Sequence, residues 1–382
     1  MKTITIKTDP SSQIDSAIAQ AMETLQQGGL VAFPTETVYG LAALADQPAS
    51  LTRLAQLKQR PVDKPFTLHI GRKSVLDRFV PDLSLLDRQF LNKAWPGPLT
   101  VIFQLNQAQQ DEVRKSLPDR LIASLYHNNS IGIRLPDHPV ACQLLTSSNS
   151  PIVAPSANLA GAAPPTCPQD VLEQLNGQIE LLLDSGPTKY AGSSTVVKIQ
   201  GDRMEIVRAG VLDFAVLERM RRVTILCVCT GNTCRSPMAE GIFRIRLAEK
   251  LSCPIDQLSE KGYKVMSAGV MAFGGMGATP EAVQASQEMG IDISSHRARL
   301  LMADMVNEAD FVFIMSSSHY KAVERLSGQA ITRTALLAED EEIDDPVGMS
   351  IEAYRQCARH IADGIDRQLE KGLVRWSAEE PS

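Results

Sequence analysis

Apolar and polar residues follow one another in an order that predicts strands and helices in turn. Short runs rich in β-branched and aliphatic residues predict strands, and longer stretches with apolar residues three and four positions apart predict helices. The expected strands include 66–70, 99–105, 131–136 and 179–185, and the expected helices include 49–60, 83–95, 139–148 and 168–177. Such alternation is typical of an α/β fold.

The pattern begins again near residue 222. The segment LDFAVLERMRR reads as a short charged helix, and RVTILCVC then opens a new strand, loop and helix unit. The alternation continues to a long helix that starts at about Ser350. We therefore predict a first domain at 1–212, a helical linker at 213–221 and a second domain at 222–382.

Composition narrows the class of protein. The 382 residues are 44% hydrophobic and 21% charged, which is ordinary for a globular chain. The net charge of −6 argues against a general nucleic-acid binder, although it allows a local basic groove. The first residues lack a secretory signal, and no apolar run approaches the roughly 18 residues that span a bilayer, so we expect a cytoplasmic protein without membrane contact.

Cysteine and histidine spacing offers little support for metal binding. The seven cysteines include no CxxC pair, which argues against zinc sites and a disulfide scaffold. Cys227 is expected in the core. His296 and His319 fall in no ligand spacing, so we assign them structural roles.

The chemically richest segment joins a predicted strand to a predicted helix, where Cys229 precedes Arg235 by six positions. A loop of this length can turn its backbone N–H groups inward around a phosphate, and Gly231 permits a tight or left-handed turn. Arg235 offers a planar fork to phosphate oxygens, and the positive surroundings should lower the pKa of Cys229, a candidate nucleophile. The other expected phosphate-loop residues are Thr230, Gly231, Asn232, Thr233, Cys234 and Ser236. Without further support, the alternative is a buried strand-end cysteine and a surface arginine.

The sequence of this loop, CTGNTCRSPMAE, resembles that of the low-molecular-weight protein tyrosine phosphatase family, and the resemblance covers roughly 222–375. It implies a Rossmann-like parallel-sheet domain that needs no cofactor and acts on phosphorylated proteins. Asp345, directly before Pro346, matches the family's general acid. Asp344 is the weaker candidate for that role.

Two features bear on the substrate of this domain. Val347 and Gly348 follow the Asp-Pro pair where the tyrosine enzymes carry aromatic residues, and Thr233 resembles the protein arginine phosphatase branch. We therefore expect phosphoarginine, with phosphotyrosine as the alternative if Phe273 or Tyr320 supplies an aromatic wall. Cys234 either packs in the core or forms a reversible disulfide with Cys229, as the resemblance suggests.

In the first half, no Walker or GxGxxG loop appears. Cations and hydroxyl or amide side chains instead stand at the ends of predicted elements, where they could surround a polyphosphate or simply be scattered surface charge. These residues are Thr35, Lys58, Arg60, His69, Arg134, Ser156, Asn158, Ser194 and Arg208.

Five motifs in this half, PTETVYGL, KQRPVDKP, WPGPLT, APSANLAG and GSSTVV, together resemble the threonylcarbamoyl-AMP synthase family over 10–210. The resemblance implies a twisted mixed sheet and the condensation of L-threonine, bicarbonate and ATP, with Mg²⁺ accompanying ATP and no dedicated protein metal site. It implies that a downstream tRNA-modifying transferase complex uses the product. The ATP-binding residues would be Lys58, Arg60, Ser156, Asn158, Ser194 and Arg208, and Thr35, His69 and Arg134 would lie near threonine.

We thus expect a bifunctional enzyme with chemically independent sites. The alternative is a phosphotyrosine phosphatase fused to a non-catalytic RNA-binding module, and weak RNA binding is an expectation in either case. The intact Lys58, Arg60, Ser156 and Asn158 favour catalysis.

Overall fold

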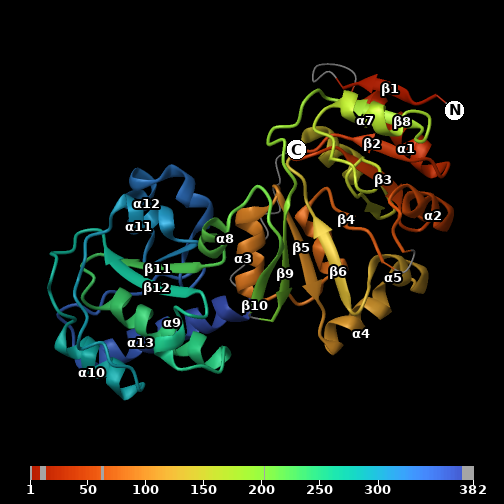
Figure 1. The fold of residues 1–382 in the computed structure, drawn as a ribbon. Helices are drawn as coiled ribbons and strands as arrows, with labels where there is room; N and C mark the ends of the chain where they lie inside the picture. The colour runs from red at the N-terminus through yellow and green to blue at the C-terminus, as the bar shows by residue number, and fades with distance from the viewer. Residues whose placement is uncertain (1, 9–13, 62–63, 202, 372–382) are drawn as a thin grey trace. The chain divides into compact units, whose positions relative to one another are not determined.

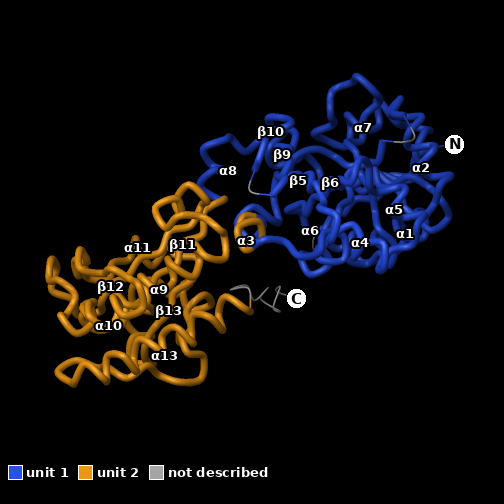
Figure 2. The backbone as a smooth tube through the Cα atoms, turned by 90° about the horizontal axis from the view of Figure 1, so that it is seen from below, with its two compact units in different colours: residues 1–84, 91–220 blue, residues 85–90, 221–382 orange. Residues whose placement is uncertain are grey.

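The computed structural model describes residues 2–8, 14–61, 64–201 and 203–371. The chain forms two compact units, which Figure 2 distinguishes by colour. Unit 1 comprises 1–84 and 91–220, and unit 2 comprises 85–90 and 221–382. The outer ends of the predicted domains, at 1 and 372–382, lie outside the described residues, as do 62–63 of the KQRPVDKP motif.

Unit 1 is built on a mixed sheet, as predicted (Figure 1). Its described strands lie in the order β1-β8-β2-β3-β7-β4-β6-β5-β9-β10. The bounds in that order are Ile4–Lys7, Leu181–Asp184, Val31–Phe33, Gly40–Leu44, Ile152–Val153, Leu68–His69, Ser130–Arg134, Leu99–Gln104, Thr195–Gln200 and Arg203–Arg208. Strands β1 and β8 run parallel, whereas β2 and β3 run antiparallel, so the sheet mixes both pairings.

Helices supply the apolar cover of this sheet. The helices of unit 1 are α1 (Ile14–Gln26), α2 (Pro48–Leu57), α4 (Gln107–Ser116), α5 (Asp119–Leu125), α6 (Pro139–Ser147), α7 (Pro168–Leu175) and α8 (Phe214–Met220), with a 3-10 turn η1 (Lys73–Arg78). Helix α3 (Leu85–Ala94) begins in unit 2 and ends in unit 1. In α1, Ala17, Ala21 and Leu25 recur every four residues and are buried. They form one cluster with Leu144 of α6 and Leu183 of β8.

Unit 2 contains a parallel four-stranded sheet in the order β12-β11-β13-β14, which confirms the predicted parallel α/β class. The strand bounds in that order are Tyr263–Gly269, Val223–Cys229, Phe311–Ile314 and Thr334–Leu336. The helices are α9 (Arg235–Lys250), α10 (Pro280–Glu288), α11 (Ala303–Glu308), α12 (Tyr320–Leu326) and α13 (Ile351–Glu370). Three 3-10 turns, η2 (Ile255–Gln257), η3 (Ser317–His319) and η4 (Gly328–Arg333), complete the unit.

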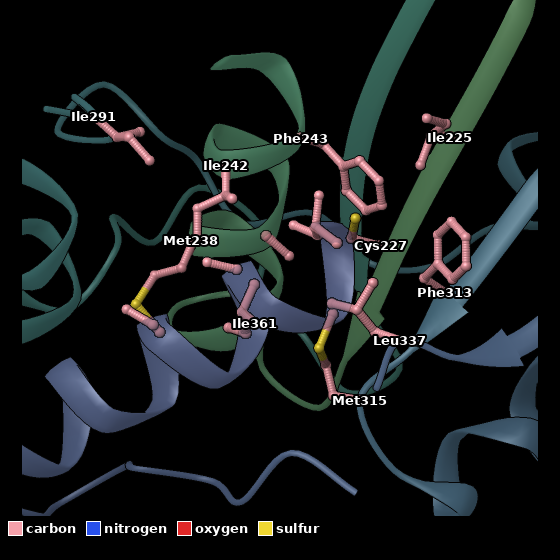
Figure 3. Packing of buried hydrophobic residues seen from close by; sticks show 14 of the residues in the cluster. Ile225, Cys227, Met238, Ile242, Phe243, Ile291, Phe313, Met315, Leu337 and Ile361 are labelled. Atoms are coloured by element: carbon pink, nitrogen blue, oxygen red, sulfur yellow. The ribbon is translucent and has the colours of Figure 1, made fainter. Parts of the chain in front are cut away.

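Strand β11 is buried along its whole length because helices cover both faces of its sheet. Its alternate residues divide between two clusters, with Ile225 and Cys227 packed on the side of α9 and α13 and Leu226 on the side of α11 and α12. Figure 3 shows Cys227 among Ile225, Phe243 and Phe313. The expectation that Cys227 is a core residue is therefore confirmed.

The described part of the chain holds no helix that is both long enough and apolar enough to cross a membrane.

Candidate active sites

A single row across the sheet of unit 1 carries several of the predicted site residues. His69 of β4 pairs with Arg134 of β6, and Arg134 pairs with Thr100 of β5. Thr100 pairs with Val196 of β9, which pairs with Arg208 of β10. Directly opposed residues on neighbouring strands project to the same face of a sheet. The strand register thus brings together residues that are up to 139 positions apart in the sequence.

This row forms the floor of a cleft of about 700 Å³, part of which is open to solvent. Of the nine residues predicted for the synthase site, six line the cleft: Thr35, His69, Arg134, Ser156, Ser194 and Arg208. The structure therefore gathers most of the predicted residues at one place, and the scattered-charge alternative does not describe them.

Arg134 is held by a buried acidic partner that sequence reasoning missed. Its guanidinium lies 2.7 Å from Glu36 Oε1 and donates to Thr37 Oγ1 at 2.6 Å. Glu36 is 1% exposed, and its other carboxylate oxygen accepts from the backbone N–H of Asp137 at 2.9 Å. A buried carboxylate with these partners fixes the arginine in place and offsets its charge. Glu36 stands inside the quoted motif PTETVYGL, so its position in that motif was the available signal.

His69 is buried beside Arg134 and remains neutral near neutral pH. Burial and the nearby arginine lower the pKa of His69 to about 3. Its Nδ1 lies 3.2 Å from the carbonyl oxygen of Thr67, which can only accept, so the ring proton belongs on Nδ1. The lone pair on Nε2 then remains available to accept a hydrogen bond.

Lys58, Ser156 and Asn158 form a second group that joins the cleft through Ser156. Lys58 Nζ donates to the carbonyl oxygen of Asn158 at 2.7 Å and to its Oδ1 at 2.8 Å. Ser156 Oγ lies 2.5 Å from the same Oδ1. Burial, together with the charge of Arg60, lowers the pKa of Lys58 to about 8. The ammonium group is therefore mostly charged at neutral pH and loses its charge more easily than an exposed lysine.

Arg60 does not line the cleft. It follows α2 and donates to the carbonyl oxygens of Lys64 at 3.1 Å and Pro65 at 2.7 Å, while its guanidinium stacks over the ring of Phe66. In this arrangement Arg60 fastens its own loop. Its predicted contact with the nucleotide remains a prediction.

At the far end of the cleft, Arg208 and Ser194 are joined. Arg208 donates to the carbonyl oxygen of Ser194 at 2.8 Å, and Ser194 Oγ lies 3.0 Å from Thr100 Oγ1. Gly210 allows this arrangement, because a Cβ at that position would lie 2.5 Å from the carbonyl oxygen of Ser193.

In unit 2 the predicted phosphate loop connects β11 to α9. Cys229 ends the strand, and its Sγ lies 2.9 Å from Ser236 Oγ in the first turn of the helix. The backbone N–H of Asn232 points at the sulfur, with a distance of 3.2 Å to Sγ. The loop thus turns back over the cysteine and directs donors toward it, as an anion-binding loop does.

The left-handed residue of this loop is Asn232 rather than Gly231, which corrects the role given to the glycine. Asn232 has φ 54°, a conformation that asparagine tolerates better than most residues. Its amide donates to Ser236 Oγ and Ser267 Oγ, both at 2.9 Å, and its Oδ1 accepts from the backbone N–H of Arg299 at 2.9 Å. Three hydrogen bonds, two of them buried, therefore hold Asn232 in the left-handed conformation.

The expected lowering of the Cys229 pKa is wrong for this arrangement. Burial raises the pKa of the thiol, and this effect outweighs the hydrogen bonds from Ser236 and Asn232 and the charge of Arg235, which lower it. Arg235 forms an ion pair with Asp345, so its positive charge is partly offset.

The two predicted catalytic charges of unit 2 meet directly. Arg235 is 5% exposed, donates to the carbonyl oxygen of Ile343 at 2.9 Å and pairs through its other terminal nitrogen with Asp345. The side chain of Asp345 is 40% exposed, so it can also reach an incoming substrate. Asp344 is exposed and makes no described ion pair, which agrees with its weaker candidacy for the general acid.

Both histidines that were assigned structural roles contact the phosphate loop. His296 Nε2 lies 2.8 Å from the carbonyl oxygen of Asn232. His319 Nε2 lies 3.0 Å from Thr230 Oγ1. No sequence signal marked either residue, because each reaches the loop from a segment more than 60 positions away.

The cysteines of the described residues are all free thiols. Cys234 is buried with its sulfur 3.5 Å from the hydroxyl oxygens of Thr279 and Tyr354, so it packs in the core in this arrangement. The reversible disulfide with Cys229 remains a prediction.

Exposed apolar side chains gather on two segments that flank the phosphate loop. Met271 and Phe273 follow β12 and are 71% and 79% exposed, and the backbone N–H of Met271 donates to the carbonyl oxygen of Thr230 at 2.9 Å. Val347 and Met349, each 58% exposed, follow Asp345. Phe273 is exposed two residues beyond Met271, and its part in an aromatic wall for a tyrosine substrate remains a prediction.

We expect Gly269→Ala to disturb the phosphate loop. A Cβ at this position would lie 2.6 Å from the carbonyl oxygen of Thr230 and 2.8 Å from the backbone nitrogen of Asn232. Overpacking of this kind costs about 1–3 kcal/mol. Thermal unfolding and hydrolysis of p-nitrophenyl phosphate should both show a loss. Gly274→Ala is the matched control, since a Cβ there meets no atom within 4 Å, and equal behaviour of the two variants would contradict the expected close packing.

Among the described residues, no three His, Cys, Asp or Glu side chains are grouped to hold a metal ion.

Comparison with known proteins finds a matching family model in each unit. A profile described as telomere recombination, covering Sua5, YciO and YrdC, matches residues 23–210. The threonylcarbamoyl-AMP synthase of Bacillus subtilis is 37% identical over 203 residues, which cover 53% of this chain and 56% of that protein. The synthase of Chromohalobacter salexigens is 34% identical over 48% of this chain and 92% of its own length. The match spans about half the length of the first curated relatives.

A second profile, low molecular weight phosphotyrosine protein phosphatase, matches residues 224–375. A solved phosphatase of that name from T. tengcongensis is 36% identical, covering 39% of this chain and 99% of its own, with a TM-score of 0.35. A YwlE mutant from Bacillus subtilis is 33% identical, covering 40% and 98%, with a TM-score of 0.35. A Sua5 variant from P. abyssi is 22% identical over 95% and 97%, with a TM-score of 0.50, and is similar in fold.

The chain belongs to the threonylcarbamoyl-AMP synthase (Sua5/YciO/YrdC) family through unit 1. Unit 2 is similar to the low molecular weight phosphotyrosine protein phosphatase family, whose model matches residues 224–375.

Proposed function

We propose that unit 1 makes threonylcarbamoyl-AMP from L-threonine, bicarbonate and ATP. The observation that carries this proposal is the cleft in which His69, Arg134, Ser194 and Arg208 line one site. Membership in the synthase family supports the choice of substrates. The cleft combines two arginines with a neutral histidine. The arginines offer positive charge to anionic groups of a substrate, and the histidine offers a hydrogen-bond acceptor to a neutral donor group.

The reaction requires no nucleophile from the protein. The amine of threonine adds to bicarbonate with loss of water, and an oxygen of the resulting carbamate attacks the α-phosphorus of ATP. The bond from that phosphorus to the bridging oxygen breaks, and pyrophosphate leaves. Lys58 and Arg208 would offset the growing charge on the phosphates, while Ser156 and Asn158 would hold the reacting groups in line.

Arg134 would receive the carboxylate of threonine, and neutral His69 would accept a hydrogen bond from its amine or hydroxyl. We also propose that Mg²⁺ enters with ATP, where it offsets negative charge on the phosphate oxygens. Because the described residues include no group of three His, Cys, Asp or Glu side chains that could hold a metal ion, the nucleotide itself would supply the ligands.

The test of this half is an omission assay on the full chain. Pyrophosphate release from ATP should require both threonine and bicarbonate, and omission of either should reduce release to background. Pyrophosphate release that does not depend on threonine would contradict the proposal. We further propose that a tRNA-modifying transferase complex consumes the product and that RNA binding by this chain is weak.

For unit 2 we propose a two-step protein phosphatase reaction, supported by the contacts among Cys229, Arg235 and Asp345. The Cys229 thiolate attacks phosphorus, the bond to the leaving group breaks, and Asp345 gives that group a proton. Water then attacks the phosphocysteine while Asp345 takes a proton, and phosphate leaves. Arg235 would bind two phosphoryl oxygens throughout.

The proposed substrate is phosphoarginine in proteins. Proton delivery by Asp345 suits cleavage of a P–N bond, whose guanidine leaves poorly as an anion. The exposed Val347 beside Asp345 offers no aromatic wall, although exposed Phe273 keeps phosphotyrosine as the second candidate. Peptides with phosphoarginine, phosphotyrosine and phosphoserine would distinguish the candidates by kcat/KM.

Thr233→Ile should shift this preference toward phosphotyrosine. The half-buried Thr233 offers a hydroxyl at the loop, and loss of a buried hydrogen bond to the polar guanidinium would change the ratio of kcat/KM values roughly 5- to 150-fold. Thr233→Ser keeps the hydroxyl and should leave the preference close to that of the parent. A parent that prefers phosphotyrosine, or a ratio that Ile does not move, would overturn the arginine assignment.

A further inference from the structure

A chain of hydrogen bonds leads from turn η3 into the phosphate loop. The backbone N–H of Ser316 donates to His319 Nδ1 at 3.2 Å, and His319 Nε2 lies 3.0 Å from Thr230 Oγ1. His319 is 1% exposed, so its ring position is fixed by packing. Thr230 directly follows Cys229 and lies 3.4 Å from a terminal nitrogen of Arg235.

The donors and acceptors along this chain can be assigned. A backbone N–H only donates, so His319 Nδ1 must use its lone pair as an acceptor. Burial and the charge of Arg235 lower the pKa of His319 to about 4, and a neutral imidazole then carries its proton on Nε2. His319 therefore donates to Thr230 Oγ1.

Thr230 receives a second donor, because the guanidinium of Arg235 also points at its oxygen. A hydroxyl oxygen has two lone pairs and one proton. With both lone pairs engaged, the hydroxyl proton must be given to an acceptor. The same Arg235 nitrogen that contacts Thr230 also pairs with Asp345, so the hydroxyl stands beside the position that a phosphoryl oxygen takes on Arg235.

We propose that Thr230 donates a hydrogen bond to the phosphoryl group and that His319 is a positioning residue that fixes the threonine hydroxyl as a donor. The proposal rests on the proposed phosphatase function of unit 2 and assigns a specific role within it. Charge on the phosphoryl oxygens changes during transfer, and a donor whose orientation is fixed in advance needs no reorganisation. Thr230 would thus act with Arg235 on the same group.

The test compares four variants of the full chain with p-nitrophenyl phosphate and with orthovanadate as an inhibitor. Thr230→Val removes the hydroxyl at nearly constant volume, and Thr230→Ser retains it. His319→Leu removes the donor, and His319→Gln replaces it with an amide that can donate to Thr230. We expect Thr230→Val to lower kcat/KM about 10- to 100-fold and to weaken vanadate inhibition, since a hydrogen bond to a charged group is lost.

Combination of the variants separates positioning from general support of the fold. His319→Leu should lower kcat/KM nearly as much as Thr230→Val, and His319→Gln should restore most of it. In the Thr230→Val background, His319→Leu should lower kcat/KM by less than a further factor of about two. His319 acts through the threonine hydroxyl, which this background lacks. Thermal unfolding of each variant reports any loss of fold separately.

Three results would overturn the proposal. Full activity and full vanadate binding in Thr230→Val would show that the Thr230 hydroxyl does not donate to the phosphoryl group. Fully additive losses in the double variant would show that His319 acts elsewhere, and failure of His319→Gln to restore activity in a folded chain would exclude hydrogen-bond donation. If the parent chain hydrolyses no phosphomonoester, the proposed phosphatase function fails instead, which is a different outcome.

Discussion

Cys229→Ser is expected to lower phosphatase turnover by on the order of 10⁴-fold or more, as removal of an enzyme's nucleophile does. Burial raises the pKa of the cysteine thiol, yet a serine hydroxyl is far harder to ionise in the same place. Asn232, Ser236 and Arg235, which would bind the phosphoryl group, are all retained in this variant. Binding of orthovanadate or tungstate should therefore survive.

The matched control is Cys253→Ser, a half-buried thiol outside the loop that should keep parental turnover. Pyrophosphate release by unit 1 should be unchanged in both variants. Appreciable turnover in Cys229→Ser, measured with p-nitrophenyl phosphate, would exclude Cys229 as the nucleophile.

Lys58→Ala is expected to lower threonine-dependent pyrophosphate release by about 10²- to 10³-fold, the usual cost of a lost electrostatic contact at the reacting group. Phosphatase turnover should remain at the parental value. Because the pKa of Lys58 is about 8, its charge disappears as pH rises through that value, and the KM for ATP should increase above pH 8. Lys58→Arg should remove this increase, since a guanidinium stays charged.

Lys58 also binds the Asn158 amide, so a structural loss must be distinguished from a lost phosphate contact. Thermal unfolding provides that distinction, and Arg120→Ala, an exposed residue of α5 outside the cleft, is the matched control. Parental pyrophosphate release in a folded Lys58→Ala chain would contradict the assigned role.

The features that could be predicted from sequence are those carried by contiguous residues. The loop from Cys229 to Ser236 and the start of α9 depend on local spacing, so their arrangement could be anticipated. Those strands of unit 1 that are encoded by a contiguous run of apolar residues could likewise be predicted. By contrast, α4 has a strongly polar composition with Val113 as its buried residue, and its helical pattern was too weak to be predicted.

The features that sequence could not supply depend on contacts between distant segments. Glu36 holds Arg134 across 98 positions, and His319 reaches Thr230 across 89. The pKa of Cys229 follows from burial and from the pairing of Arg235 with Asp345, neither of which local spacing reveals. Family motifs marked Glu36 without giving its role, whereas nothing marked His319.

The measurement that tests the two-enzyme account most directly follows both products in parallel. The parent, Lys58→Ala and Cys229→Ser chains are supplied with ATP, threonine and bicarbonate, and separately with a phosphoarginine peptide, and pyrophosphate and phosphate are quantified. The account predicts that the parent forms both products, that Lys58→Ala loses only pyrophosphate release, and that Cys229→Ser loses only phosphate release. A parent without threonine-dependent pyrophosphate release, or a single substitution that removes both products from a folded chain, would contradict it.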